Sequence, residues 1–129
     1  MKKKMLCRVV ALLAMCFMLT GCGVIYNDNN ENIQFVKEGT NSAYPGTTYG
    51  EAFDDFFSSP RWSYFEADTG EDVVEFTGGC YYNDVKVDAL MQFTLDKSAG
   101  TFEVTYLSFN DVAQNKLMIA ALLEKVFEE

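Results

Sequence analysis

The sequence predicts an α+β domain, in which an antiparallel β-meander of three to four strands carries an N-terminal and a C-terminal helix on one face. Apolar and polar residues alternate from Val85 to Leu95, as in a strand with one covered face. Apolar residues recur at helical spacing before and after the strands, over 49–57 and 119–126. The short connections in this order of helix, strands and helix favour two packed layers in one domain.

The first helix is expected to begin at a capping box, Thr48-Tyr49-Gly50-Glu51. In this motif the threonine oxygen accepts a hydrogen bond from a helical N–H, and the glutamate returns to the backbone of the cap. Four aromatic residues then share one face and predict burial against the sheet: Tyr49, Phe53, Phe56 and Phe57. We expect Pro60 to stop this helix.

Strands are expected over 61–66 and 73–77, with a bulge or bend at Gly78-Gly79 and a continuation through Cys80 to Tyr82. After the strand over 85–95, a turn leads to a last strand over 101–109. Alternation places three of its side chains inward: Phe102, Val104 and Tyr106.

The last helix is expected to be capped by Asn110 or Asp111 and to run to about Phe127. Its apolar stripe is formed by Ile119, Leu122, Leu123 and Val126. Met118 and Ala121 broaden the stripe, which predicts packing on both the sheet and the first helix.

Residues 1–21 have the order of a secretory signal. A positively charged start, Lys2 to Arg8, precedes an unbroken apolar run of 11 residues from Val9 to Leu19. A transmembrane anchor and a buried helix are the alternatives. The run is too short for a span, which needs about 20 apolar residues, and a buried helix would not be expected to open with three consecutive lysines.

The residues Leu19-Thr20-Gly21-Cys22 resemble the lipobox of bacterial lipoproteins. The resemblance covers residues 1–22 and implies cleavage between Gly21 and Cys22. It also implies a thioether-linked diacylglycerol on the sulfur of Cys22 and fatty acylation, such as palmitate, of the new amino terminus. Two or three acyl chains are enough for stable anchoring. We therefore expect a lipid-anchored protein on the extracytoplasmic face of the cell membrane.

Residues 22–46 are predicted to be a lipidated and largely disordered tether, followed by a small extracytoplasmic domain over 47–129. The run from Asn27 to Asn32 is polar and has no apolar period. Within the tether, residues 33–37 are predicted as a short strand at a sheet edge.

Charge and residue usage exclude several classes of function. Removal of residues 1–21 takes away four of the 10 Lys and Arg residues and none of the 19 Asp and Glu residues, so the formal net charge falls from −9 to −13. The remaining cations are scattered, which excludes nucleic acid as a partner, and the acyl chains rather than surface charge must hold the membrane. The sequence has no histidine, which excludes Ser-His-Asp and Cys-His nucleophile systems.

Cys80 is the thiol that remains once residues 1–21 are removed and Cys22 carries lipid. We predict that it is a small buried residue, and hence that the domain is monomeric. An intermolecular disulfide or a reactive thiol is the alternative. One cysteine without histidine cannot form a tetrahedral zinc site, and we expect neither a metal nor a cofactor.

Trp62, Tyr64, Tyr81 and Tyr82 are the candidate binding surface, with Tyr106 as a further member of the set. On an uncovered sheet face these rings would bind a sugar, a peptide or a protein partner, and otherwise they complete the core. The acidic residues Asp68, Glu71 and Asp72 suggest either calcium ligands or a solvated turn, and they lack EF-hand spacing. Glu71 with Glu75 is one of many carboxylate pairs that could suggest glycosidase chemistry.

The helix, meander, helix order resembles that of small uncharacterised lipoproteins of Gram-positive bacteria, which implies no activity. A second resemblance, to envelope lipoproteins related to outer-membrane assembly factors and β-lactamase-inhibitor-like domains, rests on Pro60, Trp62, Tyr64 and residues 74–76, and the final helix departs from it. We therefore expect a non-enzymatic binding or interaction module of the cell envelope. The alternative is a small carboxylate-dependent enzyme that acts on envelope glycan or peptide.

Overall fold

The computed structural model describes residues 29–128, so the predicted signal segment and the lipobox with Cys22 lie outside the described residues. The described chain is α+β, as predicted, with a five-stranded antiparallel meander in the order β4-β5-β6-β7-β8 where three to four strands were expected. A separate pair, β2-β3, precedes the meander. The elements are α1 (Glu31–Lys37), β2 (Thr40–Asn41), β3 (Tyr44–Thr48), α2 (Tyr49–Phe56), β4 (Ser58–Glu66), β5 (Asp72–Tyr82), β6 (Val85–Asp96), β7 (Thr101–Phe109), β8 (Val112–Ala113) and α3 (Lys116–Glu128).

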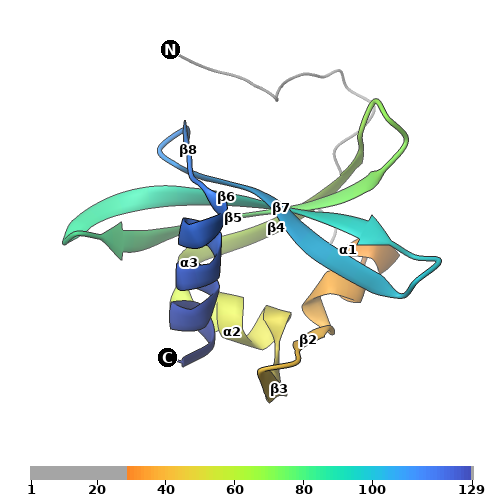
Figure 1. The fold of residues 1–129 in the computed structure, drawn as a ribbon, viewed down its shortest axis with the longest axis horizontal. Helices are drawn as coiled ribbons and strands as arrows, with labels where there is room; N and C mark the ends of the chain where they lie inside the picture. The colour runs from red at the N-terminus through yellow and green to blue at the C-terminus, as the bar shows by residue number, and fades with distance from the viewer. Residues whose placement is uncertain (1–28, 129) are drawn as a thin grey trace.

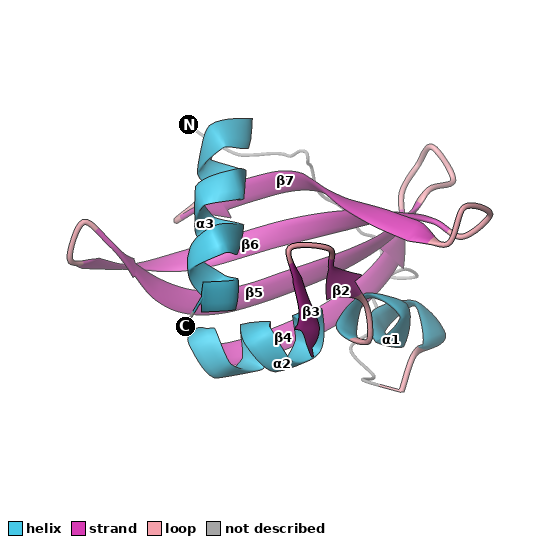
Figure 2. Ribbon diagram, turned by 60° about the horizontal axis from the view of Figure 1, so that its bottom comes forward, coloured by secondary structure: helices cyan, strands magenta, loops and turns pink. Residues whose placement is uncertain are grey.

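The helices α1, α2 and α3 lie on one face of the sheet, and the core fills the space between the two layers (Figure 1, Figure 2). Aromatic rings from α2 and the sheet dominate this core: Tyr49, Phe53, Trp62, Phe76 and Phe93. The ring of Phe53 lies 5.0 Å from that of Phe76 and 5.6 Å from that of Trp62. Because burial of one such side chain contributes about 1.5 to 3 kcal/mol, α2 is held mainly by packing.

Residues 31–37 form helix α1, so the prediction of a strand over 33–37 is wrong. The Asn30 side chain caps the helix, since its Oδ1 accepts from the N–H groups of Asn32 at 2.9 Å and Ile33 at 3.3 Å. Ile33 and Val36 lie one helical turn apart and are fully buried. The expectation of a largely disordered tether is therefore corrected for residues 31–46, which form α1, β2 and β3 and belong to the packed domain.

Helix α2 begins at the predicted capping box. Thr48 Oγ1 accepts from the N–H of Glu51 at 3.2 Å, and the Glu51 carboxylate accepts from the N–H of Thr48 at 3.1 Å. The helix already ends at Phe56, and Pro60 lies within β4 rather than terminating α2. An edge strand tolerates proline because an N–H that points away from the sheet is not needed there.

Gly78 and Gly79 do not bend β5, because its pairing with β6 runs without a register shift from Val73 to Tyr82. The predicted bulge is instead on the neighbouring strand β4, between Ser58 and Arg61. A Cβ atom at Gly78 would lie 2.7 Å from Cβ of Phe57, and one at Gly79 would collide with Oγ of Ser58. The two glycines therefore let the α2-β4 junction cross close to the sheet.

Strand β7 contains a bulge at Thr105, which changes the face of the sheet that its later side chains occupy. Val104 pairs with Phe93, whereas Tyr106 pairs with Gln92, so Thr105 is the extra residue. Phe102 and Val104 face the helices as predicted, but Tyr106 lies on the opposite face, and Leu107 continues the buried side. The inward assignment of Tyr106 is therefore wrong.

Helix α3 begins four or five residues later than expected. Asn110 and Asp111, the predicted caps, have φ of 49° and 69° and form the turn between β7 and β8. Asn115 caps the helix, since its Oδ1 accepts from the N–H of Met118 at 2.9 Å. Of the predicted apolar stripe, Leu122 and Val126 are buried, and Ile119 and Leu123 are partly buried against the core. Phe127 is buried as well, whereas the broadening residue Ala121 is exposed.

Candidate functional site

The structure separates the four aromatic candidates rather than bringing them into one surface. Trp62 is 3% exposed and belongs to the core, where its Nε1 donates to Asp54 Oδ1 at 3.1 Å. Tyr64 is half-buried and joins a polar cluster at the end of the sheet near α1. Tyr81 and Tyr82 lie together at the far end of β5, with 73% and 41% of their surface exposed.

The exposed end of the β5-β6 hairpin carries a third apolar residue that the sequence patterns did not single out. Val85 is 60% exposed and pairs directly with Tyr82 across the hairpin. We call Tyr81, Tyr82 and Val85 the hairpin tip. The sequence does contain a signal for the exposure of Val85, because a strand residue beside an Asn-Asp turn has few neighbours to cover it.

The hairpin tip is built on a tight turn and is supported from the sheet. Asn83 and Asp84 both have positive φ, 51° and 65°, as in the two-residue turns that follow the twist of paired strands. The ring of Tyr82 packs 5.4 Å from that of the buried Phe109. Phe109 pairs with Val112, which is 62% exposed and extends the apolar surface toward the start of α3. The tip thus presents its apolar side chains on an ordered support.

The hairpin tip and α1 lie at opposite ends of the sheet (Figure 1). Strand β5 runs from Asp72 to Tyr82, and at about 3.3 Å per residue its ends are about 30 Å apart. Asp72 contacts Lys97, and Lys97 contacts Glu31 in the first turn of α1. Helix α1, the first element of the described chain, therefore lies at the opposite end of the sheet from Tyr81 and Tyr82.

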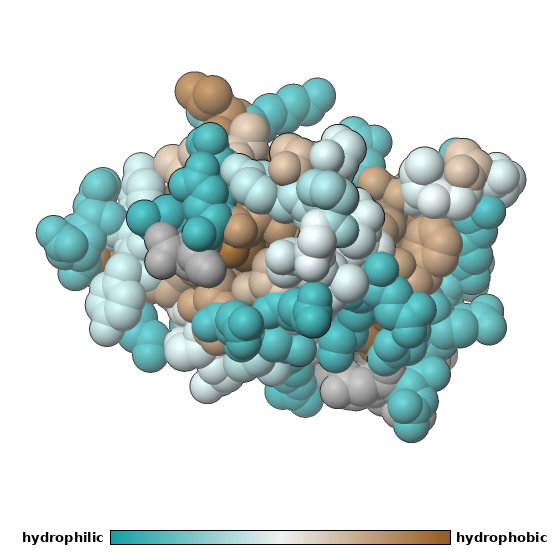
Figure 3. Space-filling view, turned by 90° about the horizontal axis from the view of Figure 1, so that it is seen from below, coloured by the Kyte–Doolittle hydropathy of each residue, from teal (hydrophilic) through white to brown (hydrophobic). Residues whose placement is uncertain are grey.

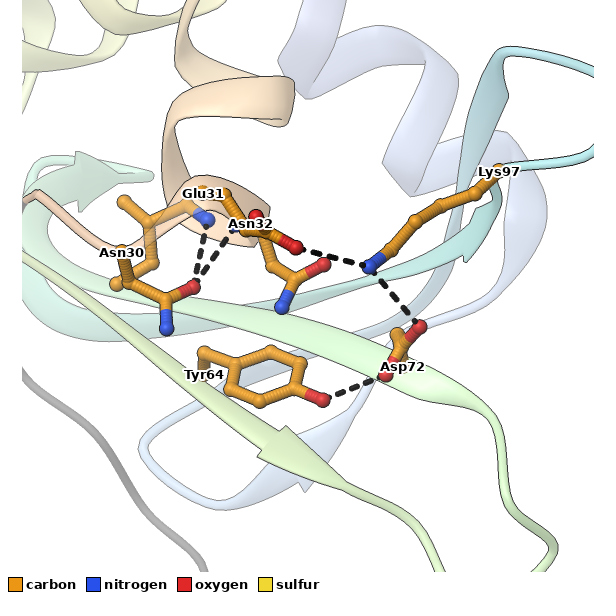
Figure 4. Close-up of polar contacts among 7 residues, drawn as sticks. Asn30, Glu31, Asn32, Tyr64, Asp72 and Lys97 are labelled. Atoms are coloured by element: carbon orange, nitrogen blue, oxygen red, sulfur yellow. Dashed lines mark hydrogen bonds and ion pairs between the residues drawn. The ribbon is translucent and has the colours of Figure 1, made fainter.

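A polar cluster joins four segments at the α1 end of the sheet (Figure 4). The Tyr64 hydroxyl donates to Asp72 Oδ1 at 2.5 Å, and Lys97 Nζ lies 3.5 Å from Asp72 Oδ2 and 3.8 Å from Glu31 Oε2. Burial and the neighbouring carboxylate raise the pKa of Tyr64 to about 12, which extends the pH range over which its hydroxyl donates to Asp72. This arrangement connects α1 to both hairpins at this end.

Asn32 adds a buried polar atom beside the same cluster. Its side chain is 6% exposed, and its Oδ1 is buried without a hydrogen-bond donor within reach. In Figure 4 the amide lies on the side of α1 that faces Tyr64, Asp72 and Lys97. The cluster also contains the Lys97 ammonium, which contacts Glu31 and Asp72. We interpret the cluster as a structural contact that holds α1 against the sheet.

Glu75 lies on the sheet face opposite the helices, where it pairs with Ser63 and Gln92. Its Oε1 accepts from Gln92 Nε2 at 3.0 Å. Burial raises the pKa of the Glu75 carboxyl, and the hydrogen bond from Gln92 partly opposes this rise. Glu71, its suggested partner in catalysis, lies in the exposed β4-β5 connection and accepts from Thr69 Oγ1.

Cys80 is buried, which confirms the prediction for this residue. It faces the helix layer between Gly78 and Tyr82 on the same side of β5. Burial raises the pKa of the Cys80 thiol, which lowers the fraction of reactive thiolate.

A hollow of about 210 Å³ opens between α2 and α3, on the side of the molecule that Figure 3 shows. It is lined by Thr47, Ala52, Asp55, Phe56, Val126 and Phe127. Figure 3 shows apolar side chains between polar ones on this helix-bearing side. The hollow is partly polar at its rim through Thr47 and Asp55, and it brings no two candidate catalytic groups together.

Over residues 29–128, no group of three or more Cys, Asp or Glu side chains is placed to hold a metal ion. Asp68 and Glu71, two of the suggested calcium ligands, are exposed in the β4-β5 connection, and Asp72 is engaged with Tyr64 and Lys97. Within the same residues, no helix has the length and apolar character needed to cross a membrane.

Comparison of the chain with protein-family models, curated proteins and solved structures gave no match. The family resemblances suggested by the sequence therefore stay predictions.

Proposed function

We propose that this chain is a membrane-anchored lipoprotein of the extracytoplasmic face, held by acyl chains on Cys22, and that its domain binds an envelope protein through the hairpin tip. The observation that carries the binding proposal is the exposure of Tyr81 and Val85, at 73% and 60%, on an ordered two-residue turn. Aromatic and aliphatic side chains held in place before binding lose little conformational freedom when a partner covers them.

The position of the tip supports a partner that is not the anchoring membrane. The proposed anchor precedes α1, and the hairpin tip lies about 30 Å away at the other end of β5. A lipid at Cys22 would therefore hold the α1 end close to the membrane and direct the tip outward. Tyr82 and Val85 lie on the helix-bearing face of the hairpin and Tyr81 lies on the opposite face, so a partner would enclose the tip from both sides in a small contact, which suits a transient protein partner.

Glu75 supports the alternative of a carboxylate-dependent enzyme. A carboxyl group with a raised pKa keeps its proton to higher pH, as a general acid requires. Substitution of Glu75 by Gln removes the proton and would abolish any such turnover of glycan or peptide. Retention of a measured turnover in Glu75→Gln would remove this residue from the reaction.

Binding is tested by capture from solubilised envelope with the mature protein and with Tyr81→Ser/Val85→Ser. We expect one partner protein that is retained by the parent and lost from the tip variant. Ala99→Ser/Thr101→Ser, at exposed residues at the opposite end of the sheet, is the matched control and should retain it. Equal capture by all three proteins, or retention of carbohydrate rather than protein, would contradict the proposed surface.

Lipid attachment is tested by metabolic labelling with a fatty acid. The parent chain should be labelled, and Cys22→Ala should remain an unlabelled precursor. Label on the Cys22→Ala chain would contradict the proposed anchor.

A further inference from the structure

The hollow between α2 and α3 takes no part in the proposed contact of the hairpin tip. Its volume of about 210 Å³ is smaller than that of pockets for drug-sized ligands, which measure about 300 to 1,000 Å³. Ala52, Val126 and Phe127 line it and are buried, and the half-buried ring of Phe56 completes its apolar surface. All four side chains belong to the core or pack against it, so the hollow exists before a ligand arrives. It has room for one side chain or for a molecule of that size.

The rim of the hollow carries a carboxylate that the fold itself does not use. Asp55 lines the hollow and is exposed. The adjacent Asp54 is engaged, since it lies 3.8 Å from Lys37 Nζ and accepts from Trp62 Nε1 at 3.1 Å. Within the described part of the chain, Asp55 takes part in no ion pair and no side-chain hydrogen bond. Thr47, the other polar lining residue, has a hydroxyl that can accept a further hydrogen bond.

Carboxylates of α3 add negative charge on the same side of the molecule. The Tyr44 ring stacks on that of Phe127 at 5.6 Å, and its hydroxyl donates to Glu128 Oε2 at 3.4 Å. Glu124 lies three residues before Phe127 and therefore on the same side of the helix. Burial and the charges of Glu128 and Glu124 raise the pKa of Tyr44. The negative charge near the hollow is therefore not limited to its rim.

The positively charged side chains on the surrounding elements do not neutralise the hollow. None of its six lining residues is a lysine or an arginine, and Glu51 lies one helical turn before the rim carboxylate. Lys37 is engaged by Asp54, which does not line the hollow. Lys125 lies two residues before Phe127 and hence on the opposite side of α3. A ligand in the hollow meets an apolar surface and net negative charge.

We propose that the hollow binds a primary ammonium group on a short alkyl stem, as in a lysine side chain or a small free amine. The stem lies against Ala52, Phe56 and Val126, and the ammonium group donates to the carboxylate of Asp55 and the hydroxyl of Thr47. A neutral alkyl ligand would leave the carboxylate without a partner, and an anionic one would be repelled. The hollow therefore selects a cation over its neutral and anionic isosteres. This site is separate from the hairpin tip and does not depend on the proposed anchor.

Methyl NMR spectroscopy of the full chain in detergent micelles tests the ligand class. The probe is n-butylamine, which has the four carbons and the ammonium group of a lysine side chain, and butanol and butyrate are its isosteres. We expect butylamine to shift the methyl signals of Ala52 and Val126 with a dissociation constant in the millimolar range, because so small a ligand makes few contacts. Butanol should bind about three- to fivefold more weakly, as expected for the loss of one exposed ion pair. Butyrate should cause no saturable shift.

Substitutions separate the charge of the site from its shape. Asp55→Asn should lower the affinity for butylamine to that for butanol and should leave butanol binding unchanged. Asp68→Asn, in the exposed β4-β5 connection, is the matched control and should retain the preference for the amine. Ala52→Leu should fill the hollow and abolish the shift of Val126 with both ligands. Because Ala52→Leu can also disturb the core, the comparison of Asp55→Asn with Asp68→Asn decides the test alone if that variant does not fold.

A lysine whose amino and carboxyl groups are capped as amides distinguishes the two sources of the ammonium group. Tighter binding than butylamine would assign the hollow to a lysine side chain of a polypeptide, and weaker binding would assign it to a free amine, because the main chain then does not fit. Three results would overturn the site: equal affinity of the parent for butylamine and butanol, an unchanged preference in Asp55→Asn, or an equal loss of preference in Asp68→Asn.

Discussion

Glu75 is a carboxyl group whose ionisation opposes folding. Burial raises its pKa above the ordinary value of 4.5, so the folded chain holds this proton more tightly than the unfolded chain does. The stabilising contribution is therefore complete below pH 4.5 and is lost as the pH rises through the pKa of the folded state.

Glu75→Gln should remove this loss, because the amide is neutral at every pH and its oxygen can still accept from Gln92. We expect the variant to be more stable than the parent at pH 7, by about 1 kcal/mol. Urea unfolding from pH 4 to pH 8 measures this, with the exposed Glu71→Gln as control. The raised pKa predicts that the free energy of unfolding of the parent falls relative to that of Glu75→Gln as the pH rises. A difference that stays constant with pH would contradict it.

Cys80 should be inert toward thiol reagents, because it is 7% exposed and burial raises its pKa. Ellman's reagent should label the native domain slowly and the unfolded domain at once. Cys80→Ala should cost about 1 kcal/mol of stability as a small core truncation and should leave the oligomeric state unchanged. Rapid labelling of the native domain would show that the thiol is accessible.

At the scale of elements, local signals predicted α2 well because its cap and its aromatic face lie within ten residues of each other. We expect Thr48→Ala to destabilise the domain by about 1 kcal/mol, since the capping box satisfies two backbone N–H groups. Thr47→Ala, which leaves the cap intact, is the matched control. Equal midpoints for the two variants in thermal unfolding would argue against the cap.

Helix α1 should be needed for a stable domain, although the sequence patterns placed it in the tether. Ile33→Ala should destabilise the domain by about 2 to 5 kcal/mol, because Ile33 is fully buried. The exposed Glu38→Ala is its control. A chain that begins at residue 46 lacks α1, and it should unfold at a lower urea concentration than a chain that begins at residue 23. Equal urea midpoints for these two chains would contradict the packing of α1.

The elements that the sequence did not predict depend on single residues whose role is set by tertiary contacts. Asn30 belongs to a polar run, and only the burial of Ile33 and Val36 makes it a helix cap. Thr105 is an ordinary strand residue, yet as the extra residue of the bulge it turns Tyr106 to the other face. Asn110 and Asp111 suit a helix cap or a turn equally well, and the pairing of β7 with β8 selects the turn.

At the scale of the whole molecule, the candidate surface was only partly predictable. The sequence identifies aromatic residues on strands, but alternation alone does not say which face the helices cover. Trp62 faces the helices and is buried, whereas Tyr81 and Tyr82 extend beyond them. Exposure is a property of the assembled layers, and the two ends of β5 differ because α1 and the polar cluster occupy one of them.

The domain has two distinct ends, the α1 end, which lies next to the proposed anchor, and the hairpin tip, which we propose faces outward. A contact made by the tip must depend on the side chains at that end and not on those of the β6-β7 turn. The opposite ends of one rigid sheet provide an internal comparison in the same molecule.

Site-specific photo-crosslinking in intact cells tests this most directly. A photoreactive phenylalanine analogue replaces Tyr81 at the tip or, as the control, Ala99 in the β6-β7 turn. We expect a discrete crosslink to one envelope protein from position 81, and its absence from position 99. Crosslinks of equal yield from both positions, or to lipid alone from position 81, would contradict it.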